Sequence, residues 1–216
     1  MAQACARILG APTKVVGASR TDAGVHALGQ AASLTTSSSI APVALRRGLN
    51  ALLPPAIRVL DARDTPAGFD ARRAALGKRY AYLIDRAHCA DPFLRRYTWH
   101  VPVTLDPDAM RRALGFVKGK HDFSAFCAAA GRGRSPVCTI RSARLVTRKT
   151  RLLVLVSADS FLHHMVRNLL GSLVEVGRGT HRSEWIKELL AGLDRTRAGP
   201  TAPAQGLVLF RVMYPV

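Results

Sequence analysis

Apolar and polar residues alternate along several short stretches of the chain, and this alternation predicts β-strands. The stretches cover residues 14–19, 30–35, 57–59, 80–84, 141–147, 151–158 and 206–214. A turn that contains glycine and aspartate separates the first two stretches. The stretches 141–147 and 151–158 flank only three polar residues, so we expect them to form a hairpin.

Other stretches repeat apolar residues every three or four positions, as amphipathic helices do. One of them ends before Pro54, whose ring removes a backbone donor. A second follows Asp106, which is expected to cap it, and has Pro107 as its first helical residue. The clearest helix is expected to open at Ser160, and a last one is expected to be capped by Ser183.

This mixture of hairpins and amphipathic helices indicates an α+β fold with an antiparallel sheet. The best boundaries lie at Pro54-Pro55 and near Gly77, and we take the second as the division between two lobes. We therefore expect an N-terminal lobe over residues 1–76, which would carry the turn around Asp22, and a C-terminal lobe over residues 77–216.

The net charge of the chain indicates the class of partner that it binds. The chain has 216 residues, with 32 lysines and arginines against 14 aspartates and glutamates, and a formal net charge of +18. The basic excess is spread along the whole sequence, so it does not form a separate basic arm. Such a surface favours a polyanionic partner, most simply a nucleic acid.

Membranes and secretion are not indicated. No apolar run approaches the roughly 18 residues that a spanning helix needs, and the first residues do not resemble a secretory signal. The four cysteines form no CxxC pair, which favours free, mostly buried thiols in a reducing compartment. We expect a cytoplasmic protein, an organelle matrix being the other compartment considered.

The first candidate for chemistry is the turn SRTDAG. Its carboxylate, Asp22, follows Arg20 by two residues, and a nearby cation favours the charged form of a carboxylate. An ionised carboxylate on a tight turn can act as a nucleophile or base at a sugar carbon. The alternative is an ordinary turn in which Asp22 bonds its own backbone.

The second candidate is the segment KRYAY at residues 78–82. Alternation places Tyr80 and Tyr82 on the same side of a strand, so one ring could stack on a nucleic-acid base between basic neighbours. The alternative is that both tyrosines pack in the core of the sheet.

The third candidate lies in the helix expected at Ser160. Arg167 is surrounded there by apolar residues, and an arginine in such a place needs a carboxylate or phosphate partner, for which Asp22 is suitable. His163 and His164 are neighbours, and adjacent helical residues diverge by about 100°. We therefore expect no metal site there and interpret them as exposed polar residues or phosphate contacts.

Six motifs carry a resemblance to a known family. In chain order they are GASRTDAGVHA, GKRYAYLI, GKHDFSAFC, CTIR, FLHHMVRNLLGSLVEVG and AQGLVLFRVMYP. Their order and spacing resemble those of the TruA-type tRNA pseudouridine synthases, and the resemblance covers essentially all 216 residues. Where the family has glycine before the RTD triplet, this chain has Ser19.

The resemblance implies a set of site residues. Asp22 would be the catalytic aspartate, Tyr80 an active-site tyrosine and Arg167 the partner of the aspartate. Arg20 would help to hold the place of the flipped-out uridine in the stem, and Leu207 would line the uridine pocket. Three further residues are expected to contact the RNA: Lys78, Arg79 and His163.

The resemblance also implies an activity and an architecture. Members of the family isomerise uridine to pseudouridine in the tRNA anticodon stem-loop, at positions 38 to 40, as homodimers and without cofactor or metal. The aspartate either attacks C1′ of the uridine or abstracts its 2′ proton. The implied fold is two ferredoxin-like lobes that share an antiparallel sheet, with helices on one face and the active-site cleft between the lobes.

Two interpretations of function follow. The first is an active tRNA pseudouridine synthase. The second is a catalytically inactive RNA-binding or ribonucleoprotein-assembly protein on the same scaffold, with a ribonucleoprotein partner. The family normally opens with a strand, YDG-type and GWQ-type segments and a helix, and MAQACARILG resembles only the tail of that helix. About one strand and most of a helix are therefore expected to be absent.

Overall fold

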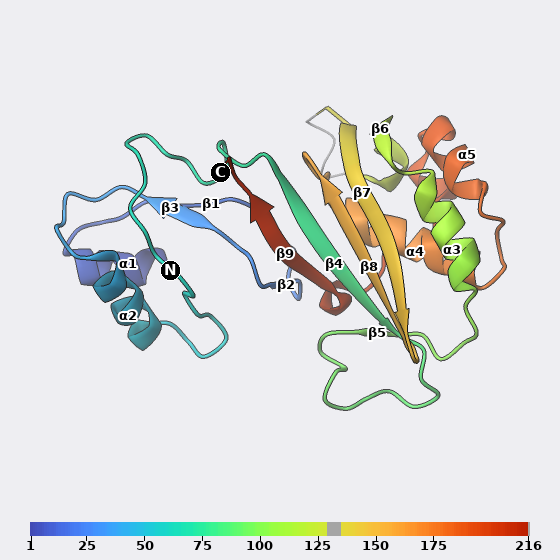
Figure 1. Cartoon of the computed structure of the whole chain (residues 1–216), viewed down its shortest axis with the longest axis horizontal. Helices are drawn as coiled ribbons and strands as arrows, with labels where there is room; N and C mark the ends of the chain where they lie inside the picture. The colour runs from blue at the N-terminus through green and yellow to red at the C-terminus, as the bar shows by residue number, and fades with distance from the viewer. Residues whose placement is uncertain (129–134, 216) are drawn as a thin grey trace. The chain divides into compact units, whose positions relative to one another are not determined.

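The structure is a computed structural model that describes residues 1–128 and 135–215. The chain divides into two compact units. Unit 1 contains Met1–Arg20 and Ala31–Ala75, and unit 2 contains Thr21–Gln30 and Leu76–Val216. Helices and strands both occur in the described residues, which confirms the α+β class (Figure 1).

Unit 1 combines two helices with a small sheet. Its elements are α1 (Ala2–Leu9), β1 (Val15–Gly17), β3 (Ala32–Leu34) and α2 (Pro42–Leu52). β1 pairs with β3 in antiparallel register, and α2 ends before the two prolines as the sequence predicts. The buried side chains of Cys5, Leu49 and Leu53 form the core of this unit.

The strand expected at residues 57–59 is not formed. Both backbone groups of Val59 bond the side chain of Asn50 on α2: its N–H donates to Oδ1 at 2.8 Å, and its carbonyl accepts from Nδ2 at 2.9 Å. The backbone of Val59 is thus satisfied by a helix side chain, and its own side chain packs on the core of unit 1. Residues 57–59 therefore show the apolar alternation of a strand without pairing with another strand.

Unit 2 contains a mixed sheet with strand order β2-β9-β4-β8-β7-β6, and β5 pairs with β4. The strands are β2 (His26–Ala27), β4 (Gly77–Asp85), β5 (Trp99–His100), β6 (Gly119–Asp122), β7 (Val137–Arg148), β8 (Arg151–Ala158) and β9 (Leu207–Met213). The predicted hairpin is confirmed as β7 and β8. The β2–β9 and β4–β5 pairs are parallel, and all others are antiparallel.

The resemblance to the family implies one sheet shared by both lobes, whereas the described strands form two sheets. β1 and β3 pair with each other in unit 1. The turn segment that follows Arg20 supplies β2, which pairs with β9 in unit 2. The segment Thr21–Gln30 therefore belongs to unit 2, and Arg20 to unit 1.

Three helices, α3 (Pro107–Gly115), α4 (Met165–Gly177) and α5 (Trp185–Gly192), lie together on one side of this sheet (Figure 1). The predicted cap of α3 is confirmed, because the Asp106 carboxylate accepts from the N–H groups of Asp108 and Ala109. α5 begins at Trp185 rather than directly after Ser183. The hydroxyl of Ser183 donates instead to the carbonyl of Ala109, at 3.0 Å.

The helix expected to open at Ser160 begins five residues later, at Met165. Most of its side chains are buried, because it packs against α3, α5 and the chain that follows α5. At Gly171 the fit is tight, since a Cβ atom would lie 1.6 Å from the carbonyl oxygen of Pro200. This close approach fixes the segment around Pro200 against the helix.

Two further observations bear on the class of protein. None of the helices in the described residues has the length and apolar character needed to cross a membrane. In the described residues no disulfide joins any of the four cysteines; Cys89 is exposed and the other three are buried, so most of the thiols are buried as the sequence predicts.

Candidate active site

Three segments of unit 2 meet around the carboxylate of Asp22. The first is the turn that carries Asp22, the second is the N-terminal end of α4 with the residues before it, and the third is the segment around Ala202. Asp22 lies 145 positions from Arg167 along the chain. Only the tertiary fold can bring these groups together.

Arg167 holds the carboxylate. Its Nη1 donates to Oδ2 of Asp22 at 2.8 Å, so the pairing expected from the sequence is present. Its Nε donates to the carbonyl of Ala202 at 2.8 Å, and the N–H of Ala202 donates back to the Arg167 carbonyl at 3.1 Å. The Arg167 side chain is 15% exposed and that of Asp22 is 25% exposed. A partly desolvated ion pair of this kind fixes the orientation of both groups.

The expectation that His163 and His164 diverge is wrong. It assumes a helix, but both residues precede α4, and His164 has a left-handed backbone with φ 60° and ψ 2°. Their imidazoles lie side by side, with centroids 3.9 Å apart and planes 34° apart. Nε2 of His163 lies 3.6 Å from Oδ1 of Asp22, and Nε2 of His164 lies 3.2 Å from Oδ2. Both rings therefore face the same carboxylate.

The environment of His164 disfavours its protonated form. Burial lowers the pKa of the imidazole, and the nearby Asp22 carboxylate opposes this effect. The other groups around it, His163, Arg167 and Arg195, lower the pKa further, and the balance lies below the ordinary value of 6.5. The imidazole of His164 is accordingly neutral at pH 7.

Three of the side chains at this site, those of Asp22, His163 and His164, could also hold a metal ion. Asp22, His163 and His164 each offer a ligand atom, and the three atoms lie within 4.8 Å of one another. Arg167 adds a fixed positive charge on the side of Oδ2. The cluster can therefore act as an oriented carboxylate, as a ligand set, or as both under different conditions.

The two tyrosines of β4 are both buried, which favours the packing interpretation for each. Tyr80 packs edge-on against Phe161, with ring centroids 5.0 Å apart, and Phe161 precedes His163 by two residues.

The hydroxyl of Tyr82 donates to the carbonyl of Pro203 at 2.8 Å. Burial raises the pKa of Tyr82 strongly, although Arg167 opposes the shift. Tyr82 thus stays protonated and fixes the segment that carries Ala202.

The remaining predicted site residues lie in several surroundings. Arg79 donates from Nε to Oγ of Ser157 at 2.8 Å, so its guanidinium is tied to the neighbouring strand β8. Lys78 is half-buried on β4, and Leu207 is buried where β9 begins, opposite Tyr82. Arg20 is exposed and ends the first segment of unit 1.

Sequence reasoning missed Asn168 as a supporting residue. Its fully buried side chain donates to the Phe126 carbonyl at 2.7 Å, and its Oδ1 accepts from Thr201 at 2.7 Å and from Arg195 at 3.1 Å. Asn168 therefore anchors the segment that leads to Ala202. An asparagine among the apolar positions of a helix is the signal that points to such a role.

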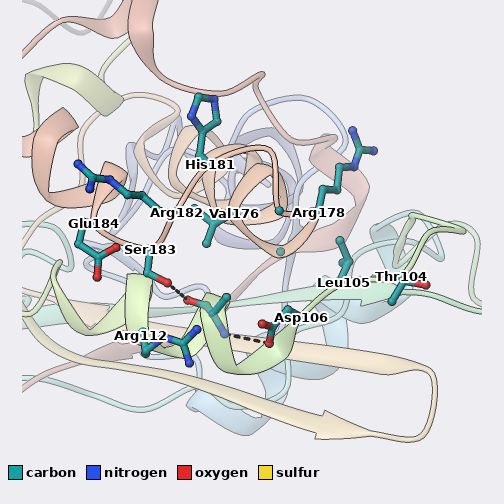
Figure 2. A pocket seen from close by; sticks show the side chains of 13 residues that line it. Thr104, Leu105, Asp106, Arg112, Val176, Arg178, His181, Arg182, Ser183 and Glu184 are labelled. Carbon is teal, nitrogen blue, oxygen red and sulfur yellow. Dashed lines mark hydrogen bonds between the residues drawn. The ribbon is translucent and has the colours of Figure 1, made fainter.

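A second feature of unit 2 lies at the other end of α4. An open pocket of about 630 Å³ is bounded there by the start of α3, the end of α4 and the loop before α5 (Figure 2). Two of its arginines have local partners: Arg178 pairs with Glu175 at 3.2 Å, and Arg182 with Glu188 at 2.6 Å. None of the site residues predicted from the sequence lines it.

Comparison with known proteins adds an independent line of observation. A family model described as tRNA pseudouridine synthase matches residues 116–215. The chain is 46% identical over 209 residues to the Myxococcus xanthus protein named tRNA pseudouridine synthase A. This alignment covers 96% of this chain and 79% of that protein. Proteins of the same name from Thiobacillus denitrificans and Syntrophotalea carbinolica are 45% and 42% identical, over 99% and 98% of this chain and 82% and 84% of theirs.

Proposed function

The chain belongs to the tRNA pseudouridine synthase A family, a family of isomerases, and on this premise we propose that it converts uridine to pseudouridine in the anticodon stem-loop of tRNA. We propose positions 38 to 40 as the targets, by resemblance to the family, and Asp22 as the catalytic carboxylate. The observation that carries the proposal is the 2.8 Å pair between Asp22 and Arg167, built by residues far apart in the sequence.

The reaction needs little beyond an oriented carboxylate. The bond between N1 and C1′ of the uridine breaks, the uracil turns, C5 bonds to C1′, and the hydrogen on C5 leaves while N1 gains one. The uridine must first leave its stack, at a cost of a few kcal/mol that contacts in the site offset. In one route the carboxylate attacks C1′, and in the other it removes the 2′ proton. Both routes require an ionised oxygen with free lone pairs.

The geometry favours Oδ1 of Asp22 as the reacting oxygen. Oδ2 accepts from Arg167 and lies 3.2 Å from His164. In the described residues, the only hydrogen bond or ion pair of Oδ1 is the 3.6 Å contact with His163. Oδ1 therefore keeps lone pairs for the sugar, while Arg167 holds the carboxylate in place. A preorganised carboxylate needs no reorientation when the reaction occurs.

Other residues are proposed to bind and place the uridine. Tyr80, behind Phe161, would support the pocket, and Leu207 would line it. Arg20 would hold the place that the uridine leaves in the stem. Lys78, Arg79 and His163 are proposed to contact the RNA, and the net charge of +18 would position its phosphates.

Assembly is part of the proposal. By resemblance to the family, the protein would act as a homodimer. Sedimentation equilibrium of the free protein tests this directly, with a mass of twice 23.3 kDa as the expected result and the mass of one chain as the contradicting one.

The experiment follows the hydrogen that leaves C5. An anticodon stem-loop labelled with tritium at C5 of its uridines releases tritium to water when pseudouridine forms. We expect release with the wild type and a loss of roughly 10³-fold or more with Asp22→Asn, with RNA affinity retained. Asp91→Asn is the matched control, because Asp91 also pairs with an arginine, Arg151 at 2.9 Å, and is 29% exposed.

The outcomes separate the interpretations. Equal tritium release by wild type and Asp22→Asn contradicts the assignment of Asp22. RNA binding by a folded wild type without any release supports the inactive RNA-binding interpretation instead. A stem-loop with deuterium at C2′ distinguishes the two routes, because only removal of the 2′ proton gives a primary isotope effect.

A further inference from the structure

The two imidazoles and the carboxylate around Asp22 have the spacing of a metal site. Zinc binds nitrogen and oxygen ligands at about 2.0–2.2 Å, so two ligands of a tetrahedral ion lie about 3.4 Å apart. Nε2 of His164 lies 3.2 Å from Oδ2 of Asp22, and Nε2 of His163 lies 3.6 Å from Oδ1, so each imidazole is near that separation from one oxygen of the carboxylate. All three ligand atoms fall within 4.8 Å of one another, so only small adjustments bring them to one ion.

The backbone holds this arrangement in place. His164 has φ 60°, a left-handed conformation that residues other than glycine rarely adopt because it is unfavourable for them. This conformation places the chain of His163 and His164 in a turn before α4, and it brings both Nε2 atoms toward Asp22. The ligands are therefore already gathered in the free protein, and little conformational entropy remains to be lost on binding.

The donor set selects a class of metal. Two imidazoles with one carboxylate suit divalent ions such as zinc, cobalt, nickel and copper, whereas magnesium and calcium prefer oxygen ligands alone. The ligands are accessible, because the side chains of His163, His164 and Asp22 are 40%, 27% and 25% exposed. An ion can therefore enter from solvent and keep open positions for water.

The surrounding positive charge limits the affinity. Arg167 lies 2.8 Å from Oδ2 of Asp22, so a metal ion binds more favourably at Oδ1, and His164, which lies near Oδ2, must move its ring toward Oδ1 to join His163 as a ligand. The guanidinium and the basic protein repel a dication. The ion is thus expected to exchange with the medium and not to act as a structural metal that the fold requires.

We propose that Asp22, His163 and His164 form a binding site for an exchangeable divalent transition-metal ion of the zinc class, and that the bound ion inhibits the enzyme. The inhibition rests on the proposed function, because the metal would occupy the oxygen that acts on the sugar. The binding itself does not depend on it.

Binding is measured first, without RNA. Metal-free protein is titrated with Co²⁺, whose ligand-field absorption in the visible reports nitrogen and oxygen ligands, and with Zn²⁺ by calorimetry. Because Cys89 and His88 are exposed neighbours that bind such ions themselves, every protein carries Cys89→Ser and His88→Gln. We expect one ion per chain at this site.

Single substitutions locate the ion. His163→Gln and His164→Gln should each weaken binding at least tenfold, about the loss that follows removal of even an outer partner of a metal. His121→Gln is the control, because that histidine bonds the Lys118 carbonyl and should not change the affinity. If His164→Gln does not fold, His163→Ala replaces it, since His163 is the more exposed of the two.

The absence of cobalt absorption, or an affinity unchanged in both histidine variants, overturns the proposal. Tritium release completes the test: Zn²⁺ should suppress it in the wild type, and a chelator should restore it. Metal that binds through the three residues without slowing turnover overturns the inhibitory part. A protein that binds metal there but never releases tritium supports the site and contradicts the proposed function, so the two failures are distinguishable.

Discussion

The two ends of helix α4 are built differently. At the N-terminal end, Arg167 pairs with Asp22 across 145 positions of the chain, and His164 is held in a left-handed conformation. At the C-terminal end, two arginines that line the pocket of Figure 2 pair with glutamates nearby in the sequence, such as Arg178 with Glu175 three residues before it. One end has a carboxylate that contacts three side chains, and the other has an open pocket.

On the proposed function, the pocket and the chemistry lie at different ends of the helix, so a pocket alone does not identify the site. Local pairs between exposed groups contribute little, because water screens them and long side chains lose entropy. A pair between distant segments in a partly buried place must be stabilised by the fold, and the fold then fixes the orientation of the carboxylate. The N-terminal end of α4 should therefore carry catalysis, and the C-terminal end only stability.

The strongest test of this comparison removes one arginine from each end. Arg167→Ala should reduce tritium release by about 10²–10³-fold, because the Asp22 carboxylate loses the group that orients it. Arg178→Ala should leave turnover within about twofold, because its pair with Glu175 is exposed. Similar losses in both variants would show that the two ends do not differ in function.

The middle of the helix offers a second test. Gly171→Ala places a Cβ atom where the Pro200 carbonyl oxygen lies, so the free energy of unfolding should fall by about 3 kcal/mol. The shift of the Pro200 segment should also displace Ala202 and lower turnover in the variant that remains folded. Gly115→Ala on α3 is the control, since a Cβ atom there meets nothing within 4 Å. Urea denaturation measures both, and equal stability of the two variants would contradict the tight packing.

A third substitution acts at the pocket. Ser183→Ala removes the 3.0 Å hydrogen bond to the Ala109 carbonyl and should lower the free energy of unfolding by about 1 kcal/mol. Turnover should not change, because Ser183 lines the pocket at the C-terminal end of α4, which none of the predicted site residues lines. A loss of turnover without a loss of stability would move the functional site toward this end.

Much of the fold follows from local signals in the sequence. The cap at Asp106, the proline that ends α2 and the hairpin at residues 148–150 are each decided by a few neighbouring residues. The false strand at residues 57–59 shows the limit of such signals. The side chain of Val59 packs on the core of unit 1. Its backbone N–H and carbonyl form hydrogen bonds with the Asn50 side chain on α2 instead of with a neighbouring strand.

The candidate site shows the same limit in a sharper form. Arg167 and Asp22 could be paired in advance, because a cation among apolar residues demands an anion. The position of His164 could not be predicted. From the sequence, a metal site is excluded because His163 and His164 are expected to be helical, but His164 precedes the helix and has a left-handed backbone. The sequence shows Asn168 only as an asparagine on the apolar face of a helix. Its partners Thr201 and Arg195 lie more than 25 residues away along the chain, so they could not be predicted. Long-range contacts of this kind leave no local pattern.

The smallest expected effect is a pH dependence confined to the pocket end. The N–H groups of Ala109 and Asp108 donate to the Asp106 carboxylate and hold its pKa below the ordinary value of 3.8. A carboxylate whose pKa is lower in the folded state binds fewer protons there than in the unfolded state, so its stabilising contribution is present above pH 3.8 and is lost as the pH falls below it. Asp106→Asn keeps the cap but cannot titrate, so thermal melts between about pH 5 and pH 3 should show a smaller loss of stability than in the wild type. Turnover at pH 7 should be the same in both proteins, and a change in it would connect the cap of α3 to the chemistry at Asp22.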